Sequence, residues 1–294
     1  MPPNTPRSCS APLLLLLCIA GVTRAAAAGQ EHKALVNRAE PFLSDLPGFT
    51  RAVIKHNYAI IPPESRVYGP LVGWHGTSGA VLSSPELGMA THFTMALAKI
   101  APGGGSDAAP EGIERFVLLI AGDLSVGKDS LPPEGFAYLP PADLRSGAIV
   151  SPTGADVLIF ERRYVPLDSG ETLFHPPFPT FQMGAVGEKP LLDTPGEMFD
   201  LRKLLPTSEE YDFNIHVMDF QPGEHLNVKE VHVNQHGLFL LEGRGIYRLG
   251  NDWFPVTAGD AIWMAPYVTQ WYAALGKSRS RYILYKDVNR PPQL

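Results

Sequence analysis

Histidines gather in one short stretch of the sequence, between His216 and His236, where four of the nine histidines occur. Within this stretch Glu230 and His232 are two residues apart, so in a β-strand their side chains point to the same face. We expect a turn at residues 234–235, after which His236 begins the adjacent strand beside them. A carboxylate and two imidazoles form a ligand set that leaves positions on a divalent metal open for substrate or water.

A fourth metal ligand is expected at Gln270, which can bind through its side-chain carbonyl oxygen. Taken singly, each of these residues is more ordinarily an exposed polar side chain on a strand edge, and a glutamine on a strand is usually only hydrogen-bonded. Three metal-ligating residues at this spacing favour a metal site over that interpretation. The sequence therefore predicts one divalent ion held by Glu230, His232, His236 and Gln270.

Three further polar residues lie on strands that are expected close to this site. Tyr247 is on the strand that follows Gly245, while Tyr282 and Lys286 are four residues apart on the last strand and share one face. Side chains of these types can transfer protons or hydrogen-bond a ligand. The alternative is that the tyrosines pack at a barrel rim and the lysine is solvated, and the residues alone leave both interpretations open.

Two stretches of the chain follow the same pattern, which predicts a repeated unit. Residues 116–124 and, after a turn-rich gap, residues 135–141 match residues 237–247 and 259–266. Each pair reads as an apolar strand into a glycine turn, then a glycine, a short apolar strand and a proline. A repeat at this distance predicts an all-β protein of two tandem barrels of similar size.

The segment between the two repeats, residues 166–206, is dense in proline and glycine and has no sustained period. We therefore expect a first barrel over residues 29–165, an inter-domain linker over residues 166–206 and a metal-binding second barrel over residues 207–294. Within the linker, residues 197–205 have the only modest helical pattern, which predicts a short helical segment.

The first barrel is expected to hold no metal. Aligning the repeats at Gly122 with Gly243, and at Pro141 with Pro266, places the four ligand positions of the second barrel on these residues of the first: Ala109, Glu111, Arg115 and Arg145. Two arginines repel a cation, so we expect this barrel to serve in packing and assembly, although its pocket could in principle bind an anion.

The overall charge argues against a nucleic-acid partner. The formal net charge is −6, the pI is near 5.8, and no run of lysines and arginines forms a stripe that could neutralise a phosphate backbone.

The N-terminus is typical of a targeting segment. Arg7 supplies positive charge, residues 11–22 form an uncharged, mainly apolar run too short to span a bilayer, and small residues follow it. We therefore interpret residues 1–28 as a cleaved signal peptide. Both cysteines, Cys9 and Cys18, lie inside it, so the mature chain is expected to lack disulfides, thiolate ligands and cysteine nucleophiles.

The metal-site region resembles a known family. Residues 223–243 look like the first cupin motif and residues 250–270 like the second. In the usual cupin order two histidines precede a glutamate and a third histidine follows, whereas here the carboxylate of Glu230 comes first and Gln270 replaces the last histidine. That variant order resembles the (S)-ureidoglycine aminohydrolases. The likeness covers nearly the whole mature chain and includes the segments Asn-Gln-His-Gly at 234–237, Trp-Met-Ala-Pro at 263–266, Gln-Trp-Tyr-Ala-Ala at 270–274 and Tyr-Lys-Asp-Val-Asn-Arg at 285–290.

The resemblance implies an all-β tandem cupin (bicupin) fold with short helical segments. It also implies hydrolysis of (S)-2-ureidoglycine to (S)-ureidoglycolate and ammonia in purine (allantoin, ureide) catabolism, with Mn²⁺ as the ion that anchors and orients the substrate. By the same resemblance the protein is an endoplasmic reticulum enzyme of plants and a homo-oligomer. The chain ends in Pro-Pro-Gln-Leu and shows no Lys-Asp-Glu-Leu type retention signal.

Individual roles also follow from the resemblance. Lys286, Tyr282 and Glu230 are expected to be catalytic, with Lys286 transferring a proton or binding the substrate carboxylate. Tyr247 and Tyr282 are expected to hydrogen-bond the substrate, and Glu230 and Gln270 to contact it as well as the metal.

Two other functions remain as alternatives. A two-histidine, one-carboxylate site would suit a germin-like cupin oxidase or dioxygenase, but the glutamine and the reordered ligands argue against it. A storage or hormone-binding bicupin would be non-catalytic, but such proteins generally lose the metal ligands that this barrel keeps.

Overall fold

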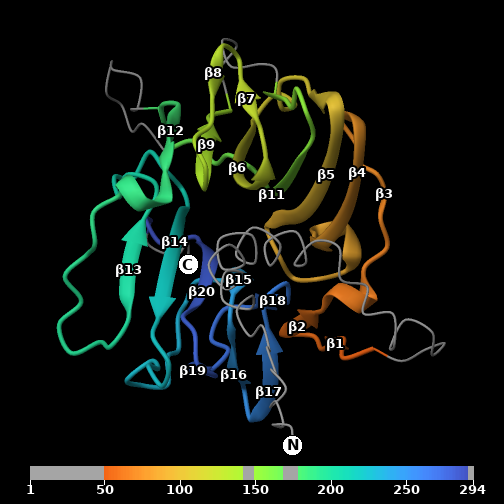
Figure 1. Ribbon diagram of the computed structural model, residues 1–294. Helices are drawn as coiled ribbons and strands as arrows, with labels where there is room; N and C mark the ends of the chain where they lie inside the picture. Colours follow the sequence, from red (N-terminus) through yellow and green to blue (C-terminus); the bar gives the residue numbers. More distant parts are fainter. Residues whose placement is uncertain (1–49, 142–148, 168–177, 291–294) are drawn as a thin grey trace, which may run out of the picture.

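The computed structural model describes residues 50–141, 149–167 and 178–290, and these form two β-barrels, one above the other in Figure 1. The expected signal peptide and both cysteines lie outside the described residues. Apart from strands, these residues form three single-turn 3₁₀ helices: η1 (Pro63–Ser65), η2 (Pro85–Leu87) and η3 (Val186–Glu188). The all-β prediction is confirmed.

The first barrel is a ten-stranded sheet. Its strands are β3 (Gly69–Pro70), β4 (Trp74–Ser83), β5 (Phe93–Ser106), β6 (Ile113–Gly122), β7 (Ser125–Val126), β8 (Asp129–Ser130), β9 (Gly135–Leu139), β10 (Ile149–Val150), β11 (Ala155–Arg163) and β12 (Gln182–Ala185). Strands β6 and β11 pair along nearly their whole length and give the barrel its most regular wall.

The second barrel combines a seven-stranded and a three-stranded sheet. The larger sheet has the order β1-β2-β18-β15-β20-β14-β13 and the smaller one β17-β16-β19. The bounds are β1 (Val53–Ile54), β2 (Tyr58–Ile61), β13 (Asp200–Lys203), β14 (Asn214–Phe220), β15 (His236–Glu242), β16 (Arg244–Leu249), β17 (Asp252–Thr257), β18 (Ala261–Met264), β19 (Gln270–Leu275) and β20 (Ser280–Lys286).

Strands β1 and β2 correct the expected domain boundary. The sequence placed residues 29–165 in the first barrel, whereas β2 pairs antiparallel with β18 of the second, Ile60 opposite Ile262. Tyr58 and Ile60 pack in the core of the second barrel, and the Tyr58 hydroxyl hydrogen-bonds Asp252 at 2.5 Å. Pairing with β2 satisfies the backbone of β18, which would otherwise be a sheet edge.

The region expected to be a linker contributes one strand to each barrel. Strand β12 pairs with β9 of the first barrel, and β13 pairs with β14 of the second. The helical segment predicted for residues 197–205 is wrong, because residues 200–203 are strand β13. Cross-strand pairing with β14 overrides the weak helical pattern.

The two barrels share one hydrophobic core. The ring of Tyr285 from the second barrel stacks on Phe93 from the first, with centroids 4.0 Å apart. Gly237 allows this approach, because a Cβ there would lie 2.5 Å from the Phe93 ring. Residues of β14 alternate: Ile215 and Val217 face this shared core, and Met218 belongs to the core inside the second barrel.

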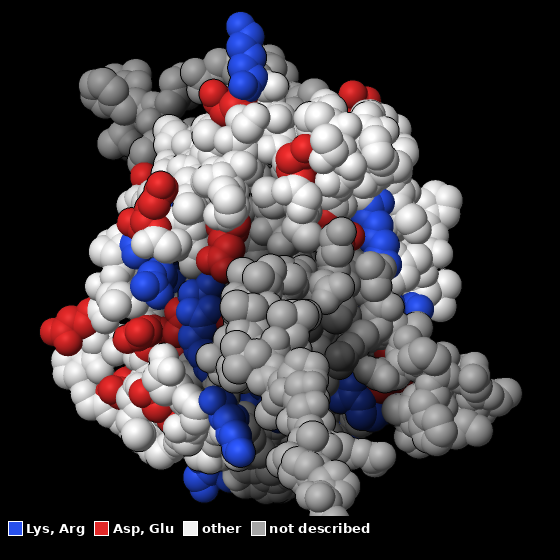
Figure 2. Space-filling view, viewed as in Figure 1, with Lys and Arg blue, Asp and Glu red and all other residues white. Residues whose placement is uncertain are grey.

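The surface carries both signs of charge. On the face shown in Figure 2, acidic and basic side chains are interspersed, and neither sign dominates that face. Within the described ranges, no helix is long and apolar enough to cross a bilayer.

Candidate metal and substrate site

Glu230 and Gln270 lie opposite each other on two extended segments. The backbone N–H of each donates to the carbonyl of the other, both at 2.9 Å, and the two residues form an antiparallel bridge. Directly opposite residues of such a pair present their side chains on the same face. Two of the four expected ligands, from opposite ends of the motif region, are therefore held together by the main chain.

The two histidines complete the group of expected ligands. Oε2 of Glu230 lies 3.2 Å from Nε2 of His232, and the rings of His232 and His236 have centroids 5.3 Å apart. The carbonyl of His232 accepts a hydrogen bond from the backbone N–H of Tyr267 at 2.7 Å, which ties the segment of His232 to the loop that precedes β19. Within the described residues, no three histidine, cysteine, aspartate or glutamate side chains converge closely enough to be a formed metal site. Glu230 and His232 contact each other instead.

The surroundings of His236 favour a metal ion at this position. Both of its ring nitrogens are buried and have no hydrogen-bond partner in the described part of the chain. Burial, and secondarily the nearby Lys286, hold the pKa of His236 well below its ordinary value, so the imidazole is neutral. A neutral imidazole is the form that binds a metal ion, and a buried one without a partner is costly. The four residues present, two imidazoles, a carboxylate and an amide, therefore fit a divalent ion.

Tyr247 acts on the site through Gln270. Its hydroxyl, on β16, donates to the side-chain carbonyl oxygen of Gln270 at 3.1 Å. Burial raises the pKa of Tyr247 well above its ordinary value, so the hydroxyl stays protonated and remains a donor. The sequence assigned Tyr247 to the substrate, whereas in the structure its hydroxyl contacts an expected metal ligand.

Lys286 lies directly opposite His236 across the β15–β20 pair, and Asn214 is its partner on β14. Burial lowers the pKa of Lys286, while Glu230 opposes that shift. Tyr282 lies on the same strand, four residues before Lys286, and is opposite Leu240 on β15 and Met218 on β14.

Tyr282 is buried beneath the expected ligands. Its ring packs edge-on against Tyr272 with centroids 5.5 Å apart. Burial, followed by Tyr247 and Glu230, raises the pKa of Tyr282 well above its ordinary value, so its hydroxyl stays protonated. The structure therefore gathers all seven sequence-selected residues inside one end of the second barrel.

Sequence reasoning gave no role to two residues on the same inner wall, His216 and Lys203. His216, on β14, is only 7% exposed, and its Nε2 is buried without a hydrogen-bond partner in the described ranges. Lys203, on β13, is directly opposite His216. The available signal was the alternation of His216 with Met218, because a polar residue in phase with core positions faces inward.

The equivalent position of the first barrel is filled by a salt bridge. Arg115, 2% exposed, lies opposite Glu161, with Nε and Oε1 2.5 Å apart. The guanidinium also donates to Ser106 at 2.8 Å and lies over the Trp74 ring. The pair Arg115–Glu161 occupies the same cross-strand position in β6 and β11 as His236–Lys286 in β15 and β20. Arg145 lies outside the described residues.

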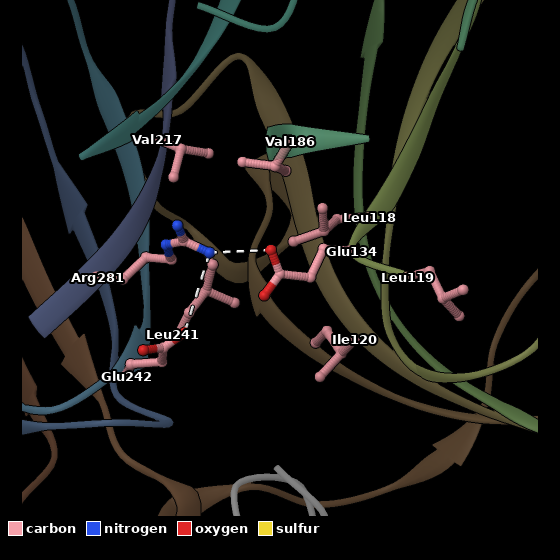
Figure 3. Close-up of a pocket in the computed structure, with 9 residues that line it drawn as sticks. All are labelled: Leu118, Leu119, Ile120, Glu134, Val186, Val217, Leu241, Glu242 and Arg281. Atoms are coloured by element: carbon pink, nitrogen blue, oxygen red, sulfur yellow. Dashed lines mark hydrogen bonds and ion pairs between the residues drawn. The ribbon is translucent and has the colours of Figure 1, made fainter. Parts of the chain in front are cut away.

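A small cavity lies between the barrels and apart from these residues (Figure 3). It has a volume of about 30 Å³, enough for one or two waters, and apolar side chains such as Leu118 and Val217 line it. At its edge Arg281 pairs with Glu134 of the first barrel at 3.0 Å and lies 4.0 Å from Glu242. Its size excludes an organic substrate.

The chain is similar to known proteins over most of its length. A cupin domain model matches residues 216–285, which include all four expected metal ligands. The (S)-ureidoglycine aminohydrolase of Arabidopsis thaliana is 54% identical over 255 residues, 85% of this chain and 82% of that protein. The (S)-ureidoglycine aminohydrolase of Escherichia coli is 30% identical over 269 residues, 86% of this chain and 99% of that protein.

Solved structures show the same fold. The crystal structure of the Escherichia coli protein Ylba is 28% identical, with a TM-score of 0.71, over 87% of this chain and 99% of that one. A Bacillus subtilis oxalate decarboxylase described with Mn(II) centres is 10% identical, with a TM-score of 0.59, over 84% of this chain and 81% of that one. The latter likeness concerns the fold alone.

Proposed function

Because this chain belongs to the (S)-ureidoglycine aminohydrolase family, we propose that it hydrolyses (S)-2-ureidoglycine to (S)-ureidoglycolate and ammonia in ureide catabolism. One structural observation carries the proposal beyond the likeness: Glu230, His232, His236 and Gln270 gather at one end of the second barrel, beside Lys286. This arrangement offers both a metal site and a titratable group facing the same space.

We propose Mn²⁺ as the metal. Carboxylate and amide oxygens suit Mn²⁺, and neutral imidazoles are compatible with it. When bound, the ion would anchor and orient the substrate and stabilise developing charge on a substrate oxygen.

The protein's own residues would handle the substrate's ionic groups and protons. The substrate carbon carries an amino group, a ureido nitrogen and a carboxylate, and the nitrogen lone pair assists loss of ammonia before water adds. Lys286 Nζ binds the carboxylate or transfers a proton, and burial lowers the pKa of its ammonium group. The amine leaves as neutral ammonia from its protonated form, and Glu230 can accept the proton that the ureido nitrogen then releases. Tyr282 hydrogen-bonds the substrate from the barrel interior. Tyr247 orients the amide of Gln270.

Release of ammonia from freshly prepared ureidoglycine, followed by chiral analysis of the ureidoglycolate formed, tests the proposed reaction. The full-length protein should release one ammonia per substrate and yield the S product. Oxygen consumption with oxalate in place of ammonia release would indicate the germin-like alternative. Absence of both activities in the metal-loaded protein would favour a binding protein.

We further propose that the protein enters the endoplasmic reticulum by a signal peptide over residues 1–28 and assembles as a homo-oligomer. The mature protein should then begin near residues 26–30 and contain no thiol. Intact mass after expression in a plant cell tests the cleavage, and a mass that retains Cys18 would contradict it. Light scattering on the purified protein tests the assembly.

A further inference from the structure

The inner wall of the second barrel carries a row of basic side chains beyond the expected metal ligands. Three strands lie side by side in the order β20-β14-β13. Lys286 ends β20, His216 lies on β14, and Lys203 ends β13 directly opposite His216. Because residues 282, 284 and 286 share a face with residues 214, 216 and 218, all three side chains face the barrel interior.

These groups are close enough to influence each other. The pKa of His216 is lowered to about 3, first by burial, then by the charge of Lys286 and then by that of Lys203. Burial lowers the pKa of Lys286, Glu230 opposes that shift, and Lys203 adds to it. Two ammonium groups therefore flank one buried neutral imidazole.

Within the described ranges, neither ammonium group has an ion-pair partner, and neighbouring positions show that this is unusual for the barrel. Arg202, the residue before Lys203, faces the other side of β13 and pairs with Asp219 at 3.1 Å. In the first barrel the counterpart of the His236–Lys286 pair is the closed Arg115–Glu161 salt bridge. The inner wall of the second barrel thus carries two lysines that form no salt bridge within the described chain.

The acidic groups nearby do not fill this role. Glu230 is near enough to raise the pKa of Lys286, but its carboxylate contacts His232 at 3.2 Å and forms no salt bridge with either lysine in the described chain. Asp287 accepts the backbone N–H of Gln235 at 3.0 Å, and burial raises its pKa. An anion supplied from outside is the complementary partner for two ammonium groups on one inner wall.

We propose that Lys203, together with Lys286, binds the carboxylate of the substrate and that His216 is a positioning residue that holds the two ammonium groups apart on the wall. The assignment rests on the proposed function and extends it to the strand β13. It makes the acid group of the substrate, and not only its ureido group, a determinant of specificity. The binding affinity of a neutral analogue that lacks the carboxylate should not depend on Lys203.

Binding of two unreactive probes tests the proposal without turnover. Ureidoacetate carries the ureido group and the carboxylate but no amine to lose, and its primary amide lacks the charge. In calorimetry with the purified, metal-loaded full chain, Lys203→Met should weaken ureidoacetate binding about tenfold, the size expected for one charge-assisted hydrogen bond. Binding of the amide should not change. Lys203→Arg should recover most of the affinity for ureidoacetate.

The matched control is Lys277→Met, which removes the same charge from an exposed position at the far end of β19 and β20 and should leave both affinities unchanged. In steady-state assays Lys203→Met should raise KM by a similar factor with little change in kcat, because it removes binding and not proton transfer. His216→Asn should raise KM with the melting temperature nearly kept.

Two outcomes would overturn the assignment. Equal loss of ureidoacetate and amide binding in Lys203→Met would indicate a general structural effect, and no loss of either would mean that Lys203 does not contact the ligand. Failure of the unmodified protein to release ammonia, with Lys203-dependent binding of ureidoacetate intact, would refute the reaction but leave the carboxylate site standing.

Discussion

Glu230 and Gln270 are joined by two reciprocal backbone hydrogen bonds of 2.9 Å, so the main chain sets the spacing of two expected metal ligands. This bridge does not depend on either side chain. The relative placement of the two Cα atoms should therefore survive substitution, and a change in ligand chemistry can be tested apart from a change in fold.

The first prediction is that Gln270→His keeps the metal but loses most of the activity. Imidazole is a good ligand for Mn²⁺, so binding should persist, with a shift in selectivity toward Fe²⁺ or Zn²⁺. The ring directs its donor differently from the amide, and a displacement of about 1 Å can cost on the order of 10²-fold in rate. Metal content, kcat and the melting temperature of the variant measure these effects. A variant with the parent's kcat and the same metal would show that Gln270 only neighbours the ion.

The second prediction concerns Tyr247→Phe, which removes the hydroxyl that donates to the Gln270 carbonyl oxygen at 3.1 Å. Losing a group that orients a ligand typically costs roughly 10- to 100-fold in metal affinity or activity. We expect weaker metal retention during dialysis against a chelator, together with a lower kcat. Tyr267→Phe is the control, because Tyr267 is exposed and contacts His232 only through its backbone. Unchanged metal retention with a raised KM would instead place the Tyr247 hydroxyl on the substrate.

The third prediction separates the two barrels. His232→Ala should abolish bound metal, because all four expected ligands lie in the second barrel. Arg115→Met should leave the metal content of one ion per chain unchanged but destabilise the protein by about 2 kcal/mol, since it leaves the half-buried Glu161 without its partner. Elemental analysis and denaturant unfolding measure the two effects. Two ions per chain in the unmodified protein would contradict this assignment.

The fourth prediction concerns Glu114, a fully buried carboxyl between the barrels. Burial, and then the neighbouring Asp212, raise the pKa of Glu114 well above its ordinary value, and the Tyr138 hydroxyl donates to it at 2.6 Å. The folded state therefore favours the protonated form. The stability gained from this is fully present below about pH 4.5 and is lost as the pH rises through the folded-state pKa.

Glu114→Gln should remove this dependence, because an amide does not titrate. The melting temperature of the parent should fall relative to that of the variant as the pH is raised from about 4.5, while both respond alike to the other titrating groups. The control is Glu111→Gln, at an exposed position, which should follow the parent at every pH. A difference in melting temperature between Glu114→Gln and the parent that stays constant across the pH range would show that the pKa of Glu114 is the same in the folded and unfolded states.

The sequence by itself determined the all-β class and the residues of the candidate site. Tyr282 and Lys286 could be placed on one face because a strand alternates with a period of two, and both lie on β20. Glu230 and His232 were expected together for the same reason and are in contact at 3.2 Å, but Glu230 forms only an isolated bridge and His232 lies outside the strands. The repeat also located Arg115 at the position of His236, and the structure has both at the same place in their sheets. Each of these inferences depends only on local spacing, which strand geometry fixes.

Tertiary structure alone decided which distant segments pair. It added β2 to β18 and made residues 200–203 a strand in place of the predicted helix. It also brought the hydroxyl of Tyr247 to Gln270, and it set Lys203, His216 and Lys286 in a row across three strands. Their physical basis is cross-strand hydrogen bonding and the burial of side chains between sheets, which outweigh local propensity. No spacing within a single segment records which strand will become its neighbour.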